Sequence, residues 1–416
     1  MDRKTILLVI IGLGIRLFLI FPGPFESKVG FFTNKADLRN YYWPAETALD
    51  GANPYVLWAS GQSGEFRADM APLELLAYVA TVRVWNDPRA IQVLFALFDA
   101  INIMLLGVLL RRSPLRLPFQ IFYALGPLTL YNLGLVPEDK TIALTLTFLI
   151  FYFLILAPET EWRIGGIGVR PLMLVVPVAA VLASFKWLSA FYLLPLLLFV
   201  SRDVRGFVKQ AIVFGVILAL AHLPWIPDWS YVYIFRAQRM NTLLAHIAPA
   251  SLLNALGLFD KNVMLAIVAL SLLLIYALFW FKRIDIFETM ALTVMVGILG
   301  TPDMDPVHLS LVVLYLLLVV DWTSRARLLT VWGLSAWVVS VFAISTRTGY
   351  VRYGLPDLRI ITGVYGTPQM IVLSYALFIV VLGFYLFDKA RGRAMGKSVL
   401  VDVISGVEPS GGMVDA

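Results

Sequence analysis

The chain has 416 residues, of which 60% are hydrophobic and 14% charged, with a formal net charge of +6. Soluble globular domains hold about 25% charged residues, so this composition indicates an integral membrane protein. The absence of cysteine excludes disulfides and Cys-ligated metals, and the three histidines lie too far apart along the chain to suggest a His-rich metal site. We attribute the positive charge to cytoplasmic helix ends and expect no nucleic-acid partner.

Apolar runs that approach 20 residues, without the period-two alternation of barrel strands, predict transmembrane helices. In chain order these runs fall near residues 5–22, 90–110, 117–135, 140–157, 171–185, 187–200, 210–224, 262–281, 284–300, 308–320, 328–344 and 367–387. The segment 72–85 is short for a span and carries Glu74 and Arg83, so we assign it to an amphipathic helix lying on the outer surface.

With that assignment the basic clusters of the short loops all face the cytoplasm, as the positive-inside rule requires. The sequence therefore predicts an all-α polytopic membrane protein with about 12 transmembrane helices, both termini inside and a long first outer loop holding interfacial helices. Residues 1–394 would form one transmembrane domain, with outer segments at 23–88 and 225–261, and residues 395–416 a disordered cytoplasmic tail. The multi-pass topology is expected in a plasma membrane.

The first candidate for chemistry is Asp37, which follows the first span in a long polar loop. A charge beside the bilayer is costly to maintain, and a loop of this length is not needed merely to connect two helices. Asp37 is a candidate general base, although pairing with Lys35 or Arg39 would explain it equally well. The aromatic residues that follow suit a membrane interface and also the lining of a sugar-sized cleft. They are Tyr41, Tyr42 and Trp43.

Two outer turns carry the next candidates. Glu138 and Asp139 precede the span at 140–157, where acids favour the positive end of a helix dipole or can face the same cavity as Asp37. Lys186 lies between two very apolar segments. A lysine there can extend to the interface, or it can neutralise the phosphate of a lipid-linked substrate, which is the interpretation we prefer.

Further polar residues lie in the second half of the chain. Arg236 and Arg239 occupy the outer segment 225–261, where they can grip a phosphate or remain solvated. His308 closes an outer turn that also holds Asp303 and Asp305. Two carboxylates fall short of the six to eight oxygens usual for calcium, so we expect no metal ion there.

The order of these residues resembles that of the GT-C superfamily, the polytopic glycosyltransferases that use lipid-phosphate-linked sugars. The likeness is closest to polyprenyl-phosphate-mannose-dependent mannosyltransferases of phosphatidylinositol mannoside synthesis and to the catalytic subunit of the first GPI mannosyltransferase. It covers roughly residues 5–320 and departs from the family pattern at Arg39, where many members have a second Asp, and at Leu309, where they have a second His. The matching stretches are Asp37 with Tyr41-Tyr42, Gly51-Ala52-Asn53-Pro54-Tyr55, Ala71-Pro72-Leu73, Glu138-Asp139, Phe185-Lys186 with Pro195, and Thr301-Pro302 through His308.

This resemblance implies hexose transfer, with mannose favoured, on the outer face of the membrane. Asp37 would take a proton from the acceptor hydroxyl, and the departing lipid phosphate would be stabilised by Lys186, with Arg236, Arg239 and His308 as further candidates. The implied partners are a polyprenyl-phosphate sugar donor, a lipid or glycolipid acceptor and the membrane lipids. Because cations can stabilise a monophosphate leaving group, the mechanism needs no cofactor.

The alternative is a membrane transporter or a flippase for lipid-linked sugars, without transferase activity. Such a protein needs ionisable residues lining the middle of its spans. The main residues of that kind are Arg16 and Asp99. The environment of these two side chains therefore discriminates between the two classes of function.

Overall fold

A computed structural model describes the chain over residues 2–25, 36–64, 66–111, 113, 115–126, 129–130, 139–156, 161–164, 167–201, 203–224, 260–299 and 387. These segments are mainly helical, and three of their helices are long and apolar enough to cross a membrane. They are Pro88–Leu109, Val204–His222 and Asn262–Trp280. The predicted all-α membrane character is thus confirmed in this coarse form, while about 12 spans remains a prediction.

Aspartates begin four of the long helices. In each case a side-chain oxygen of the aspartate accepts a hydrogen bond from a backbone N–H of the first turn, which would otherwise lack a partner. The four helices are α1 (Arg3–Ile20), α6 (Pro88–Leu109), α12 (Val204–His222) and α15 (Lys261–Trp280). At α6 the next residue is Pro88, whose fixed φ suits the first helical position.

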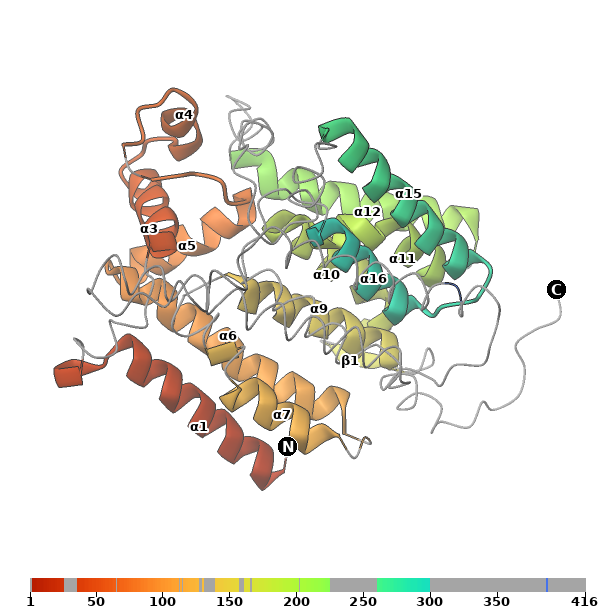
Figure 1. Cartoon of the computed structure of the whole chain (residues 1–416), viewed down its shortest axis with the longest axis horizontal. Helices are drawn as coiled ribbons and strands as arrows, with labels where there is room; N and C mark the ends of the chain where they lie inside the picture. The colour runs from red at the N-terminus through yellow and green to blue at the C-terminus, as the bar shows by residue number, and fades with distance from the viewer. Residues whose placement is uncertain are drawn as a thin grey trace, which may run out of the picture.

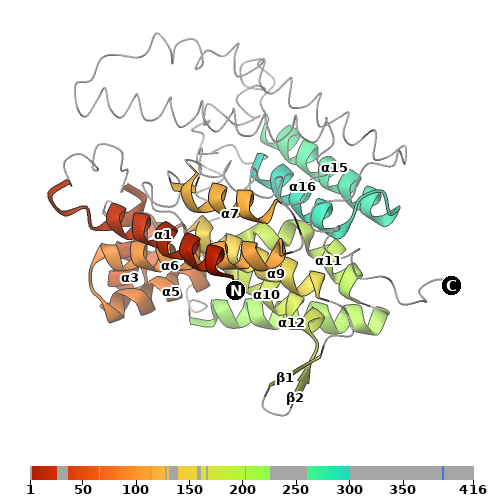
Figure 2. The ribbon, with the colours of Figure 1, turned by 90° about the horizontal axis from the view of Figure 1, so that it is seen from below.

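The first half of the chain forms one bundle. Helix α6 packs against α1, α7 (Arg116–Leu125) and α9 (Lys140–Ile155), and α9 also packs against α10 (Val175–Phe185). Between α9 and α10 the chain forms a short antiparallel hairpin that projects from the bundle, made of β1 (Trp162–Ile164) and β2 (Ile167–Val169) (Figure 2).

The second half of the described chain joins this bundle through α10. The predicted continuous span at 187–200 is divided into a 3-10 helix, η4 (Trp187–Tyr192), and α11 (Leu193–Val200). Likewise, η3 (Pro171–Leu174) precedes α10. Helix α16 (Ile286–Leu299) packs against η4, α11 and α15.

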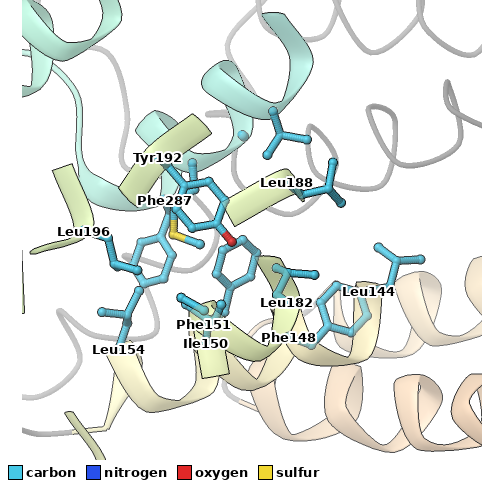
Figure 3. Packing of buried hydrophobic residues seen from close by; sticks show 14 of the residues in the cluster. Leu144, Phe148, Ile150, Phe151, Leu154, Leu182, Leu188, Tyr192, Leu196 and Phe287 are labelled. Carbon is cyan, nitrogen blue, oxygen red and sulfur yellow. The ribbon is translucent and has the colours of Figure 1, made fainter. Parts of the chain in front are cut away.

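The main hydrophobic core lies where these helices meet. Figure 3 shows side chains of α9, α10, η4, α11 and α16 converging on one another. Phe151 and Phe287 meet edge-to-face, with ring centroids 5.4 Å apart. The labelled members are Leu144, Phe148, Ile150, Phe151, Leu154, Leu182, Leu188, Tyr192, Leu196 and Phe287.

The predicted first outer loop folds into helices at one end of the bundle. Helices α3 (Ala36–Leu49), α4 (Pro54–Ala59) and α5 (Pro72–Val84) gather there beside the start of α6 (Figure 1). Helix α5 packs against α3, α6, α10 and α12, and Leu75 and Tyr78 on it are fully buried. This helix is therefore covered by neighbouring elements to a greater extent than a helix resting on a membrane surface would be.

Candidate active site

Asp37 is the second residue of α3, which lies within the segment predicted as the first outer loop. One turn further on, Tyr41 is buried, with its ring 5.2 Å from that of Tyr78 and 5.8 Å from that of Phe95, measured between centroids. These aromatic contacts fasten α3 to α5 and α6. The structure thus gives Tyr41 a core role that requires no sugar.

The other two predicted sugar-binding residues are half-buried. The Tyr42 hydroxyl donates to Glu46 Oε1 at 3.1 Å and lies 2.7 Å from Asn86 Oδ1. Trp43 has the guanidinium carbon of Arg39 at 5.7 Å from its ring centroid, a cation–π arrangement. Both rings retain exposed surface on α3.

A cluster of four charged residues lies beside these helices, where α5, the start of α9 and the end of α10 meet. We call Glu74, Asp139, Lys140 and Lys186 the charged cluster. Lys140 Nζ lies 2.9 Å from Asp139 Oδ1, and Lys186 Nζ pairs with Asp139 Oδ2 and lies 3.7 Å from Glu74 Oε2. The predicted site residues Asp139 and Lys186 are therefore brought together, although 47 positions separate them in the sequence.

Glu74 is the deepest member of the charged cluster, with no exposed side-chain surface. The Tyr78 hydroxyl donates to its Oε1 at 2.8 Å, and its Oε2 lies near the same ammonium group, that of Lys186, as Asp139 Oδ2. Burial, followed by the negative charge of Asp139, raises the pKa of Glu74 well above its usual range, and the positive charge of Lys186 opposes this only in part. Glu74 therefore favours its neutral form.

Asp139 and Lys186 favour their charged forms. Burial alone would raise the pKa of Asp139, but the charges of Lys140 and Lys186 outweigh it and lower the pKa below its usual range. Burial alone would lower the pKa of Lys186, but the charges of Asp139 and Glu74 outweigh that effect and raise it. The side chain of Lys186 remains 30% exposed, so it is the member of the charged cluster that reaches the surface.

Apolar neighbours of the charged cluster connect it to the helix of Asp37. Ile142, just after Asp139, and Phe185, just before Lys186, belong to the same buried cluster as Leu38 and Tyr41 of α3. Tyr55 belongs to it as well, and its hydroxyl donates to the carbonyl oxygen of Met70 at 3.0 Å. The start of α3, the acidic turn and the lysine turn thus lie around one hydrophobic cluster.

A second buried charge pair lies deeper in the bundle. Arg16 Nε donates to Asp99 Oδ2 at 2.5 Å, and the two side chains are 1% and 0% exposed. Asp99 Oδ1 accepts from the hydroxyl of Tyr123 at 2.7 Å and from that of Thr141 at 2.8 Å. The two ionisable residues on which a transport pathway would depend are therefore paired and enclosed.

An apolar groove of about 440 Å³ lies between α11 and α15. Pro195, which forms part of the sequence pattern around Lys186, lies on its wall. Because the lining side chains are almost all apolar, a hydrocarbon chain is the ligand that matches its chemistry. The lining residues are Leu194, Pro195, Leu198, Leu273, Tyr276, Ala277, Phe279, Trp280 and Phe281.

Four predicted site residues lie outside the described residues, namely Glu138, Arg236, Arg239 and His308. Among the residues that the structure does describe, no group of three or more His, Cys, Asp or Glu side chains is arranged to hold a metal ion.

The sequence reasoning did not assign Glu74 or Lys140 to the site. In the sequence, Glu74 is a charge in a segment that is short for a span, and Lys140 is the first residue of the predicted span 140–157. A carboxylate within an otherwise apolar stretch of α5 is the signal that distinguishes Glu74. Its partners could not be read from the sequence, because they come from two other helices.

Comparisons with known proteins add no further assignment, because the chain matches no family model, no curated protein and no solved structure.

Proposed function

We propose that the chain is a membrane glycosyltransferase that transfers a hexose, with mannose favoured, from a polyprenyl-phosphate donor to a lipid or glycolipid acceptor. The reaction takes place on the outer face of the plasma membrane, and both chain termini face the cytoplasm. The observation that carries the proposal is the convergence of α3, the Asp139 turn and Lys186 around one buried cluster. This arrangement supports a shared site, because it brings the helix that carries Asp37 and the turns that carry Asp139 and Lys186 to the same hydrophobic cluster.

The chemistry is a single displacement. The acceptor hydroxyl oxygen forms a bond to the anomeric carbon, while the bond from that carbon to the phosphate oxygen breaks and its electron pair leaves with the lipid phosphate. Asp37 receives the hydroxyl proton, and Lys186 stabilises the charge that develops on the departing phosphate. Attack from the face opposite the leaving group inverts the anomeric centre. The apolar groove between α11 and α15 offers a surface for the hydrocarbon tail of a lipid substrate.

The test is a radiolabel transfer assay in detergent, with synthetic polyprenyl-phosphate mannose and a membrane lipid extract. Asp37→Asn should lower transfer by about 10²- to 10⁴-fold, the range that a general base contributes. Asp50→Asn is the matched control, because Asp50 is an exposed carboxylate just beyond the other end of α3. Wild-type turnover in a folded Asp37→Asn protein would exclude Asp37 as the base.

The assay also addresses the transporter or flippase alternative. If the wild-type protein transfers no label from mannose, glucose or arabinose donors, the transferase proposal fails and the alternative becomes the better one. The enclosed Arg16–Asp99 pair does not favour that alternative, since neither side chain has the exposure that a transport pathway requires.

A further inference from the structure

Glu74 occupies a place in the charged cluster that the proposed reaction leaves unused. It is fully buried on α5, between the hydroxyl of Tyr78 on its own helix and the carboxyl group of Asp139 at the start of α9. Its Oε2 receives no hydrogen bond from the described part of the chain, and the nearest cation, Lys186 Nζ, is 3.7 Å away. A buried oxygen in that position is costly as an acceptor but favourable as a donor.

The distances within the charged cluster decide which carboxyl group holds a proton. The carboxyl groups of Glu74 and Asp139 are both buried and lie near one ammonium group, that of Lys186, so they cannot both be ionised without a large electrostatic cost. Both lysines lie close to Asp139, at Oδ1 and at Oδ2 respectively, whereas Glu74 has only the more distant Lys186. The negative charge therefore belongs on Asp139 and the proton on Glu74.

We propose that Glu74 is a positioning residue that works as a neutral carboxylic acid, donating its proton from Oε2 to Asp139 while its Oε1 accepts from Tyr78. In this way it fixes the Asp139 carboxylate, which in turn holds the ammonium group of Lys186 at the open side of the charged cluster. The inference deepens the proposed function and rests on it, since Lys186 is the group assigned to the phosphate. It explains why a second carboxyl group persists inside the protein beside Asp139, although Lys186 lies closer to Asp139 than to Glu74.

The protonated form also sets the charge of the charged cluster. Lys140 and Lys186 contribute two positive charges, Asp139 one negative charge and neutral Glu74 none, which leaves one net positive charge. The positive end of the α9 dipole lies beside them, because Lys140 is the first residue of that helix. A singly charged phosphodiester approaching Lys186 neutralises this excess, whereas an ionised Glu74 would already have cancelled it.

The experiment compares Glu74→Gln with Glu74→Ala. Glutamine keeps an acceptor for Tyr78 and a donor for Asp139, so Glu74→Gln should retain transfer and phosphate binding within about threefold. Alanine keeps neither the acceptor nor the donor, so Lys186 is no longer held in position. Sugar transfer and phosphate binding should then each fall by about 10- to 100-fold. Binding is measured by calorimetry with a short-chain prenyl phosphate in detergent. Glu288→Gln, which alters a buried carboxylate on α16, is the control and should match the wild type.

Each outcome bears on the inference. Equal losses in Glu74→Gln and Glu74→Ala would overturn it, because they would show that the ionised carboxylate is required. Wild-type binding in Glu74→Ala would overturn it too, because no positioning role would remain. If Glu74→Ala fails to fold, the folded Glu74→Gln protein still decides, since the proposal requires it to bind. In a further outcome, phosphate binding follows the expected order, retained in Glu74→Gln and lost in Glu74→Ala, while the wild-type protein transfers no sugar. That result would uphold the inference, and the proposed function would fail.

Discussion

Two groups of buried charges in this protein differ in how completely they are satisfied. The Arg16–Asp99 pair lies inside the helix bundle, and both carboxylate oxygens of Asp99 accept hydrogen bonds. Arg16 also donates from Nη1 to the carbonyl oxygens of Gly12 and Ala124, at 3.0 Å and 3.1 Å. The charged groups of this pair already have protein partners. The pair therefore acts as a structural connection between α1, α6, α7 and α9, which we call the closed joint.

The charged cluster is different because one of its side chains, that of Lys186, reaches the surface. The side chain of Lys186 remains 30% exposed, and its ammonium group lies near carboxylate oxygens of both Asp139 and Glu74. The two groups are also adjacent in the chain, since Thr141, which donates to Asp99, follows directly on Lys140. The Arg16–Asp99 pair thus fixes the start of α9, and the charged cluster beside it is the group to which we assign ligand binding in the proposed function.

The largest expected effect comes from breaking the closed joint. Asp99→Ala leaves the Arg16 guanidinium buried without its counter-charge, which should lower the free energy of unfolding by about 3–5 kcal/mol. The measurement is thermal unfolding in detergent. The double change Arg16→Met with Asp99→Leu is the control, because replacing both partners by apolar residues should recover most of the loss. An unchanged unfolding temperature in Asp99→Ala would show that the pair does not stabilise the bundle.

The next largest effect is expected from removing the ammonium group of Lys186. Lys186→Ala should weaken use of the donor in the transfer assay by about 2–4 kcal/mol, the range for losing a desolvated charge contact. Lys209→Ala on α12 is the matched control, because that side chain is exposed and lies outside the charged cluster. Donor kinetics equal to those of the wild type would refute the role given to Lys186.

A smaller effect is expected at the edge of the closed joint. Asn102 Nδ2 donates to the Tyr123 hydroxyl and to the Thr141 carbonyl oxygen, both at 2.9 Å, and its Oδ1 accepts from Thr145 at 2.7 Å. Asn102→Ala should lower the free energy of unfolding by about 1–3 kcal/mol, because buried partners lose their hydrogen bonds. Transfer per folded molecule should stay unchanged; a loss there would mean that the joint also takes part in the reaction.

The smallest effect is a pH dependence of stability. The pKa of Glu74 is raised on folding, so above its usual value of 4.5 the folded state binds more protons and stability falls as the pH rises. The pKa of Asp139 is lowered, so its contribution is lost only as the pH falls below its usual range. Other titratable groups near Glu74 are Tyr55, Tyr78 and Lys186, while Lys140 lies beside Asp139.

As the pH rises above about 5, the unfolding temperature of the wild type should therefore decline more steeply than that of Glu74→Gln, which cannot ionise at this position. Parallel declines in the two proteins would contradict a proton held by Glu74 in the folded state.

Several long helices can be located from the apolar runs of the sequence alone. The apolar runs at 90–110, 210–224 and 262–281 correspond to α6, α12 and α15, with starts that differ by two, six and one residues. Such runs and their preceding aspartates are local signals, because helix hydrogen bonds and N-caps connect residues only a few positions apart. The division at Trp187–Tyr192 was not visible, since a 3-10 helix has no distinct apolar period.

The pairing of charged residues that lie far apart in the sequence follows from the tertiary structure. Arg16 and Asp99 are 83 positions apart, and Glu74, Asp139 and Lys186 come from three different segments. A hydrophobic pattern indicates which face of a helix is buried, but it does not say which other helix covers that face. The sequence identified Asp139 and Lys186 as separate candidates. Their pairing, and the buried position of Glu74 beside them, follow from how α5, α9 and α10 pack together.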